Sequence, residues 1–120
     1  MNYRFKLGTI IADDIDKSID FYQNVLGFKL IRKFYREEGG LCLLESPDGA
    51  SIELIDSKVF PKGFWSLGME VDDFDAAIDD LREKGMTFVF GPEELPLGKL
   101  AGIEDPNGVK IVVLSLNDGQ

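Results

Sequence analysis

The 120-residue sequence contains no histidine and only one cysteine, Cys42. Histidine is the side chain that most often binds transition metals and transfers protons near neutral pH, so its absence argues against both kinds of site. A single cysteine cannot form a disulfide within the chain. Because Cys42 lies among the apolar residues of "GLCLLE", we expect a buried structural thiol and no cysteine nucleophile.

Long hydrophobic runs and positive charge are also scarce. No stretch of about 18 apolar residues is present, and "MNYRFKLGTIIADD" lacks the features of a signal peptide, so we expect a cytoplasmic protein without a membrane partner. Thirteen basic residues stand against 22 acidic ones, for a net charge of −9. This balance disfavours nucleic acid, which requires basic clusters. It indicates a soluble, well-hydrated surface, with attraction of a cationic ligand as the alternative.

What the chain does contain is an internal repeat. Four pairs of like residues are each separated by 59 positions: Asp14 and Asp73, Pro47 and Pro106, Gly49 and Gly108, Ile52 and Ile111. A constant offset across each half indicates two copies of one unit. We therefore predict a first module at 1–57, a linker at 58–63 and a second module at 64–116, together forming one domain over 1–120.

Each copy has the pattern of a βαβββ module. In both, a strand rich in β-formers precedes an aspartate suited to cap a helix, and the helix ends at a glycine. The predicted helices are 15–26 and 74–84, and the predicted strands are 5–12, 28–36, 41–45, 51–55, 65–71, 87–90, 99–104 and 109–114. We predict an α+β fold in which two modules form an open, cup-like mixed sheet with the helices outside. Phe21 and Phe74, on the helices, are expected in the core.

Two segments are harder to assign. "FGPEELPLGKL" at 90–100 contains two prolines and two glycines, so we expect an irregular connection, with a lid over the cup as the alternative. "RKFYREEGG" at 32–40 mixes three basic residues with two acids, a composition typical of a solvated hairpin end.

Strand alternation assigns side chains to the two faces of the sheet. It predicts that Leu7, Thr9 and Glu53 of the first module face the cup. The same parity in the second module places Ser66 and Val112 there. Glu53 is thus the single acid predicted in the cup, and the equivalent position of the second copy holds Val112.

The motifs "DIDKSIDFYQNVLGF" and "SLGMEVDDFDAAIDDLREKGM" and the hairpins "SPDGASIELI" and "DPNGVKIVVL" resemble the vicinal oxygen chelate superfamily of glyoxalases, bleomycin resistance proteins and ring-cleaving dioxygenases. The resemblance implies a metal site at four positions, which here hold Leu7, Ser66, Glu53 and Val112. Only Glu53 keeps a ligand-type side chain, so we expect no metal and no cofactor, and metal-dependent glyoxalase or dioxygenase chemistry is the least favoured function. The resemblance also implies a homodimer, with the groove built within one chain or by module exchange.

Two functions remain open. The first is binding or sequestration of a small molecule, with Glu53 as anchor and with Tyr35, Trp65 and Phe88 as ring faces, although each ring also suits ordinary packing. The second is a metal-independent lyase or isomerase in which Glu53 acts as general base. For Glu53 itself, the structural alternative is a bond to a neighbouring arginine, lysine or tyrosine.

Overall fold

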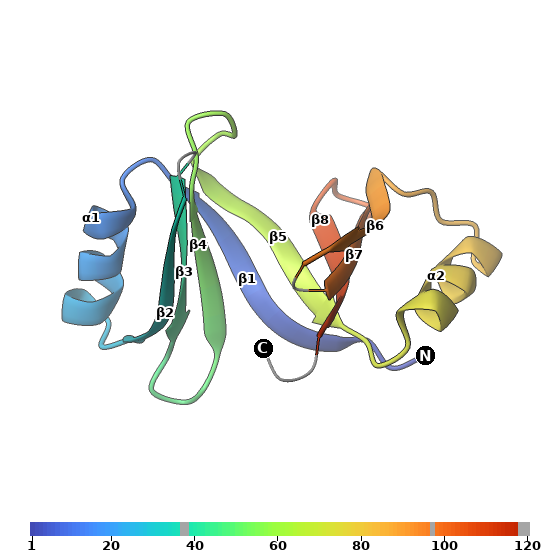
Figure 1. The fold of residues 1–120 in the computed structure, drawn as a ribbon, viewed down its shortest axis with the longest axis horizontal. Helices are drawn as coiled ribbons and strands as arrows, with labels where there is room; N and C mark the ends of the chain where they lie inside the picture. The colour runs from blue at the N-terminus through green and yellow to red at the C-terminus, as the bar shows by residue number, and fades with distance from the viewer. Residues whose placement is uncertain (37–38, 97, 118–120) are drawn as a thin grey trace. The chain divides into compact units, whose positions relative to one another are not determined.

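The computed structural model describes residues 1–36, 39–96 and 98–117, and it contains two compact units (Figure 1). Leu7–Trp65 form what we call the N-terminal unit. Met1–Lys6 and Ser66–Gln120 form the C-terminal unit. The two units are defined by which residues contact one another in space, and they are not divided at the limits of the sequence repeat. The predicted module limits at 57 and 64 therefore stay a prediction.

Both units follow the predicted βαβββ order, and the α+β class is confirmed. The first copy of this order consists of β1 (Arg4–Ala12), α1 (Ile15–Asp20), β2 (Lys29–Arg36), β3 (Gly39–Glu45) and β4 (Ser51–Asp56), with a π-helical turn, η1 (Phe21–Val25), after α1. The second copy consists of β5 (Gly63–Glu70), α2 (Phe74–Glu83), β6 (Phe90–Leu95), β7 (Gly98–Glu104) and β8 (Lys110–Leu116). Within the described residues, no helix has the length and apolar character needed to cross a bilayer.

In the N-terminal unit, α1 packs on one face of β2, β3 and β4 (Figure 1). Asp14 caps the helix by accepting a hydrogen bond from the backbone N–H of Lys17 at 3.2 Å. Ile15 and Ile19 of α1 are buried against Cys42, Leu44 and Leu54, each fully buried. The expectation that Cys42 is a buried thiol is confirmed.

The first helix is shorter than predicted, because α1 gives way at Phe21 to a π-helical turn, η1 (Phe21–Val25). The wider spacing of a π-turn alters which side chains face the sheet. Tyr22 packs against the core, whereas Phe21 is 47% exposed. The prediction that Phe21 is a core residue is therefore wrong.

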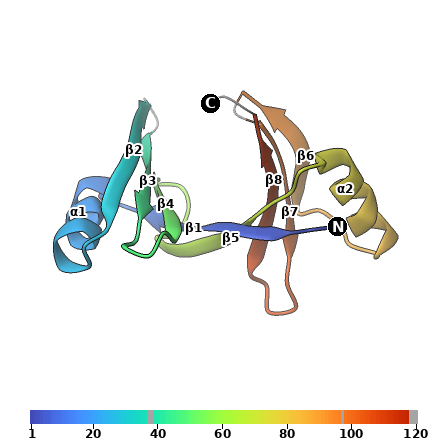
Figure 2. The ribbon, with the colours of Figure 1, turned by 90° about the horizontal axis from the view of Figure 1, so that it is seen from below.

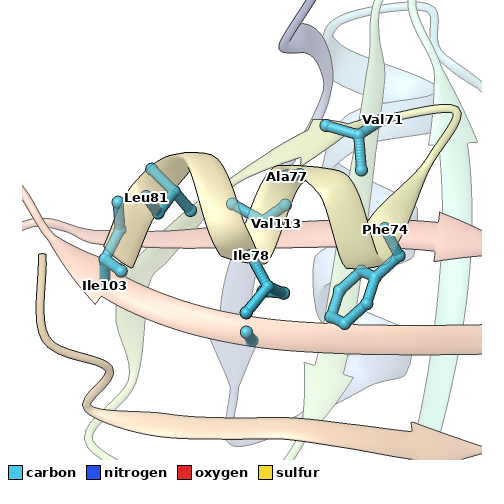
Figure 3. Close-up of a cluster of buried hydrophobic side chains, with 8 residues drawn as sticks. Val71, Phe74, Ala77, Ile78, Leu81, Ile103 and Val113 are labelled. Carbon is cyan, nitrogen blue, oxygen red and sulfur yellow. The ribbon is translucent and has the colours of Figure 1, made fainter. Parts of the chain in front are cut away.

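In the C-terminal unit, α2 packs against β7 and β8 through a buried cluster (Figures 2 and 3). Asp73 caps this helix by accepting from the Ala76 N–H at 3.0 Å. Ile78 and Leu81 of α2 belong to one buried cluster with Val113 and Ile103 of the sheet (Figure 3). Phe74 belongs to the same cluster, as expected.

Between α2 and β7, the structure differs from the predicted strand at 87–90 and from the predicted connection at 90–100. Residues 87–89 are not a strand, and Phe90–Leu95 form β6, which pairs with β7. The segment is therefore neither an irregular connection nor a lid. A strand tolerates Pro92 because β6 is the outermost strand of this unit, and the pairing register shifts between Phe90 and Glu93.

The first residues of the chain join the C-terminal unit through polar contacts. The Tyr3 hydroxyl donates to the Asp80 carboxylate at 2.6 Å, and Arg4 forms an ion pair with Asp72 at 2.9 Å. Burial, together with the neighbouring Asp80 carboxylate, raises the pKa of Tyr3 to about 12. These contacts explain why residues 1–6 group with this unit.

Candidate functional site

The candidate site lies on the sheet face of the N-terminal unit that is opposite α1. The strands of this unit are ordered β2-β3-β4-β1. Since Cys42, Leu44 and Leu54 point toward α1, the residues between them point to the other side. We call this side the distal face and define it by two rows of register partners: Arg32, Leu43, Glu53 and Thr9, and Phe34, Leu41, Ile55 and Ile11.

Glu53 is the acid at the centre of the first row. Its carboxylate is half-buried and accepts a hydrogen bond from the Thr9 hydroxyl at 3.1 Å. Thr9 itself is 3% exposed. Burial raises the pKa of Glu53, and the hydrogen bond from Thr9 opposes this effect without cancelling it.

The structural alternative for Glu53 required a bond to an arginine, lysine or tyrosine, whereas the hydrogen bond found comes from Thr9. In the described part of the chain, no arginine or lysine forms an ion pair with Glu53. Its immediate cross-strand neighbour in β3 is the half-buried Leu43. The Glu53 carboxyl group therefore lies in partly apolar surroundings, and its hydrogen-bond donor among the described residues is the neutral Thr9 hydroxyl.

The sequence alone did not place Arg32 on the distal face. Strict alternation from Leu30, which packs toward α1, assigns Arg32 to the α1 side. The register of β2 shifts between Leu30 and Arg32, however, so that Arg32 pairs with Leu43 and Lys33 pairs with Cys42. This bulge moves Arg32 to the side of Glu53, and no local sequence signal marks it.

The remaining candidates of the N-terminal unit fall in different surroundings. Leu7 is half-buried and, by alternation from Thr9, lies on the distal face. Trp65 packs against Phe60, with ring centroids 5.8 Å apart. The side chain of Tyr35 lies outside the described part of the structure.

Ser66, Val112 and Phe88 belong to the C-terminal unit. Ser66 is 1% exposed, and it pairs in register with Lys110. Val112 lies on the face opposite α2, because its neighbours Ile111 and Val113 pack against that helix. Phe88 packs into the α2 core instead, 5.5 Å from the Arg82 guanidinium, which supports ordinary packing over a role as a ligand face.

Of the candidates, the structure thus joins Thr9 and Glu53 by a direct contact. A further ring, Phe90, pairs with Gly102 on the α2-opposed face, and a Cβ at Gly102 would meet its ring atoms. Gly102 in turn pairs with Val112. Phe90 of β6, Gly102 of β7 and Val112 of β8 are therefore register partners in one row across the three strands.

The four positions implied as metal ligands do not fit a zinc or nickel ion. Leu7 and Val112 offer no lone pair, and a neutral serine hydroxyl such as that of Ser66 is a poor ligand. Glu53 is left as one carboxylate, and it already accepts from Thr9. Within the described residues, no group of three or more cysteine, aspartate or glutamate side chains is placed to hold a metal.

Comparison with known proteins identifies the family. Residues 5–113 match the model of the Glyoxalase/Bleomycin resistance protein/Dioxygenase superfamily. The chain is 32% identical to a lactoylglutathione lyase of Neisseria meningitidis, over 88% of this chain and 86% of that protein. It is also 32% identical to a probable lactoylglutathione lyase of Synechocystis, over 92% and 94% of the two chains.

Solved structures agree with the fold. A methylmalonyl-CoA epimerase from Mycobacterium tuberculosis matches with a TM-score of 0.79 at 23% identity, over 95% of this chain and 88% of that one. A hypothetical protein from Bacillus halodurans matches with a TM-score of 0.82 at 17% identity, over 100% and 99%. The chain belongs to the glyoxalase, bleomycin resistance protein and dioxygenase superfamily, and the predicted glyoxalase-like fold is confirmed.

Proposed function

We propose that the protein binds a small molecule without a metal ion, and that Glu53 anchors this ligand on the distal face of the N-terminal unit. The observation that carries the proposal is the state of Glu53, a half-buried carboxylate whose one hydrogen bond within the described residues comes from Thr9. A folded protein gains nothing in stability from such a charge. Perturbed acids of this kind are typical of sites that bind or react.

The charge of the chain supports a ligand that presents a cation or a hydrogen-bond donor to Glu53. The net charge of −9 attracts cations over a distance, and the carboxylate then forms a charge-assisted hydrogen bond at the site. Phe34, on the same face, is 37% exposed and offers a ring to an organic cation. Sequestration of a cationic drug, as in the superfamily members named for bleomycin resistance, is one form of this function.

The raised pKa of Glu53 supports a second candidate, a metal-independent lyase or isomerase. A carboxylate that is partly removed from water is a stronger base, and it can take a proton from a carbon acid. The similarity to proteins named lactoylglutathione lyase and methylmalonyl-CoA epimerase favours this class of reaction. In both candidates, the same carboxylate faces the ligand.

Replacing Glu53 with glutamine tests the anchor. Because the native pKa of Glu53 is raised above its ordinary value of 4.5, the folded state binds the proton more tightly than the unfolded state. The wild-type protein therefore loses stability as the pH rises from 4.5 through the native pKa. Glu53→Gln removes this loss, so its midpoint of thermal unfolding should be higher than that of the wild type at pH 8 and equal to it near pH 4.

The same variant should lose the ligand. We expect a panel of cationic antibiotics and small carbonyl compounds, added to chelator-treated protein, to include a compound that raises the unfolding midpoint. Glu53→Gln should weaken the binding of that compound by about tenfold or more, because the variant loses the free energy of one hydrogen bond to a charged group. Consumption of that compound would identify an enzyme, and binding without consumption would identify sequestration.

Thr9→Val is the matched control for this experiment. It keeps the shape of the side chain, removes the hydroxyl that donates to Glu53, and should raise the pKa of Glu53 further while leaving the carboxylate available. If Glu53→Gln is less stable than the wild type at pH 8 and binds every compound equally well, Glu53 is a structural residue and the proposal is wrong.

A further inference from the structure

The bulge in β2 places a basic residue, Arg32, in the same row of the distal face as Glu53. Arg32 pairs in register with Leu43, and Leu43 pairs with Glu53, so two strand spacings separate the basic residue from the acid. At about 4.8 Å per spacing, the two backbone positions are roughly 10 Å apart. An apolar side chain, Leu43, lies between them.

Arg32 differs from three lysines of this unit that have acidic partners. Lys33, Lys58 and Lys62 form ion pairs with Asp16, Asp56 and Asp13. Lys29 has the acid Glu45 as its cross-strand partner. Among the described residues, by contrast, no acid forms an ion pair with Arg32, whose cross-strand partner is a leucine.

The Arg32 side chain nevertheless has an aromatic neighbour on this face. Its guanidinium lies 5.9 Å from the centroid of the Phe34 ring, which is on the same face. A cation–π contact of this kind favours positions of the guanidinium near the ring, and it uses none of the N–H donors. The planar guanidinium can therefore form two parallel hydrogen bonds to a carboxylate or a phosphate.

We propose that Arg32 binds an anionic group of the ligand, so that the molecule on the distal face is amphoteric. Its cationic or hydrogen-bond-donating end meets Glu53, its anionic end meets Arg32, and an apolar segment crosses Leu43. This inference rests on the proposed function of Glu53 and adds the chemical class of the ligand. It also assigns a specificity role to Arg32, because a simple cation makes no use of this residue.

Two small probes of equal chain length test the proposal. 6-Aminohexanoate carries an ammonium and a carboxylate at opposite ends of five methylenes, and hexylamine lacks the carboxylate. Binding to the chelator-treated protein is measured by NMR titration, since affinities for molecules of this size are roughly millimolar. We expect 6-aminohexanoate to bind the wild type more tightly than hexylamine by about tenfold.

Variants then separate the two anchors. Arg32→Met, which keeps an apolar stem, should reduce binding of 6-aminohexanoate to the level of hexylamine and leave hexylamine unchanged. Arg32→Lys should fall between the two, because it keeps the charge and loses the planar fork. Lys17→Met is the charge-matched control, since Lys17 lies on α1, on the other side of the sheet, and it should change neither probe.

Each result bears on one of the two proposals. If Arg32→Met leaves 6-aminohexanoate binding unchanged while Glu53→Gln abolishes it, the role of Arg32 is wrong and the proposed function stands. If Glu53→Gln leaves both probes unchanged, the proposed function itself fails. If the wild type binds neither probe, or if Lys17→Met weakens binding as much as Arg32→Met, the amphoteric ligand is also contradicted.

Discussion

Leu44→Ala is expected to lower the free energy of unfolding by about 2–5 kcal/mol, the usual cost of truncating a buried leucine. Leu44 is 0% exposed and lies between α1 and the sheet, in contact with a cluster that includes Leu54 and Ile19. The packed neighbours cannot collapse fully into the space that is left. Domains of this size are stable by about 5–15 kcal/mol, so urea unfolding should show a large fall in the midpoint.

Leu43→Ala is the matched control for Leu44→Ala. Leu43 is the preceding residue of the same strand, but it is only half-buried and points to the distal face. Its truncation should cost about 1 kcal/mol, because less apolar surface is withdrawn from water there. A loss for Leu43→Ala equal to or greater than that for Leu44→Ala would mean that the two faces of β3 are assigned the wrong way round.

Gly98→Ala is expected to destabilise the protein by roughly 3 kcal/mol or more, since it combines a strained backbone with a collision. Gly98 begins β7 opposite Leu116 of β8, with a φ of +155°. A Cβ at this position would meet the carbonyl oxygen of Ser115 and lie 2.9 Å from the Cα of Leu116. Both are backbone atoms, so relief requires the two strands to separate.

Gly108→Ala is the control that has the backbone strain of Gly98→Ala without its steric collision. Gly108 also has a positive φ, of +83°, but no atom lies within 4 Å of the Cβ position. Its substitution should cost about 1–2 kcal/mol, the penalty of a left-handed residue alone. Equal losses in thermal or urea unfolding for the two glycine variants would show that β7 and β8 are not in close contact at Gly98.

The sequence predicted those parts of the fold that depend on local chemistry. Asp14 and Asp73 cap the helices because an aspartate side chain accepts from the free N–H groups of the first turn. The turns that follow Ser46 and Asp105 close where proline and glycine preset the backbone. The repeat then required both halves to share one order of elements.

Other parts depend on neighbours that the sequence does not reveal. Pro92 argued against a strand, but β6 is an outermost strand of its unit, where an absent N–H costs little. Phe21 fell within the helical period, and the π-turn that exposes it breaks that period. In both cases the position in the fold overrides a sound local rule.

The sequence predicted only part of the candidate site, because alternation holds in regular strands and fails at a bulge. Glu53 and Thr9 follow strict alternation in strands without irregularities, so their shared face was predicted, and the structure adds the hydrogen bond between them. Arg32 lies beyond the bulge after Leu30, where alternation assigns the wrong face. Bulges arise from pairing between strands, and no residue of "KLIRKF" signals this one.

The most direct test is an NMR titration of the Glu53 side-chain carboxyl, first in the presence of chelator and then with one equivalent of zinc. We predict a pKa above the ordinary value of 4.5, due to burial, and no change in the Glu53 signal when zinc replaces the chelator. A pKa at or below 4.5 would contradict a desolvated anchor. A signal that shifts with zinc would show that Glu53 binds metal after all, and it would restore metal-dependent chemistry to this chain.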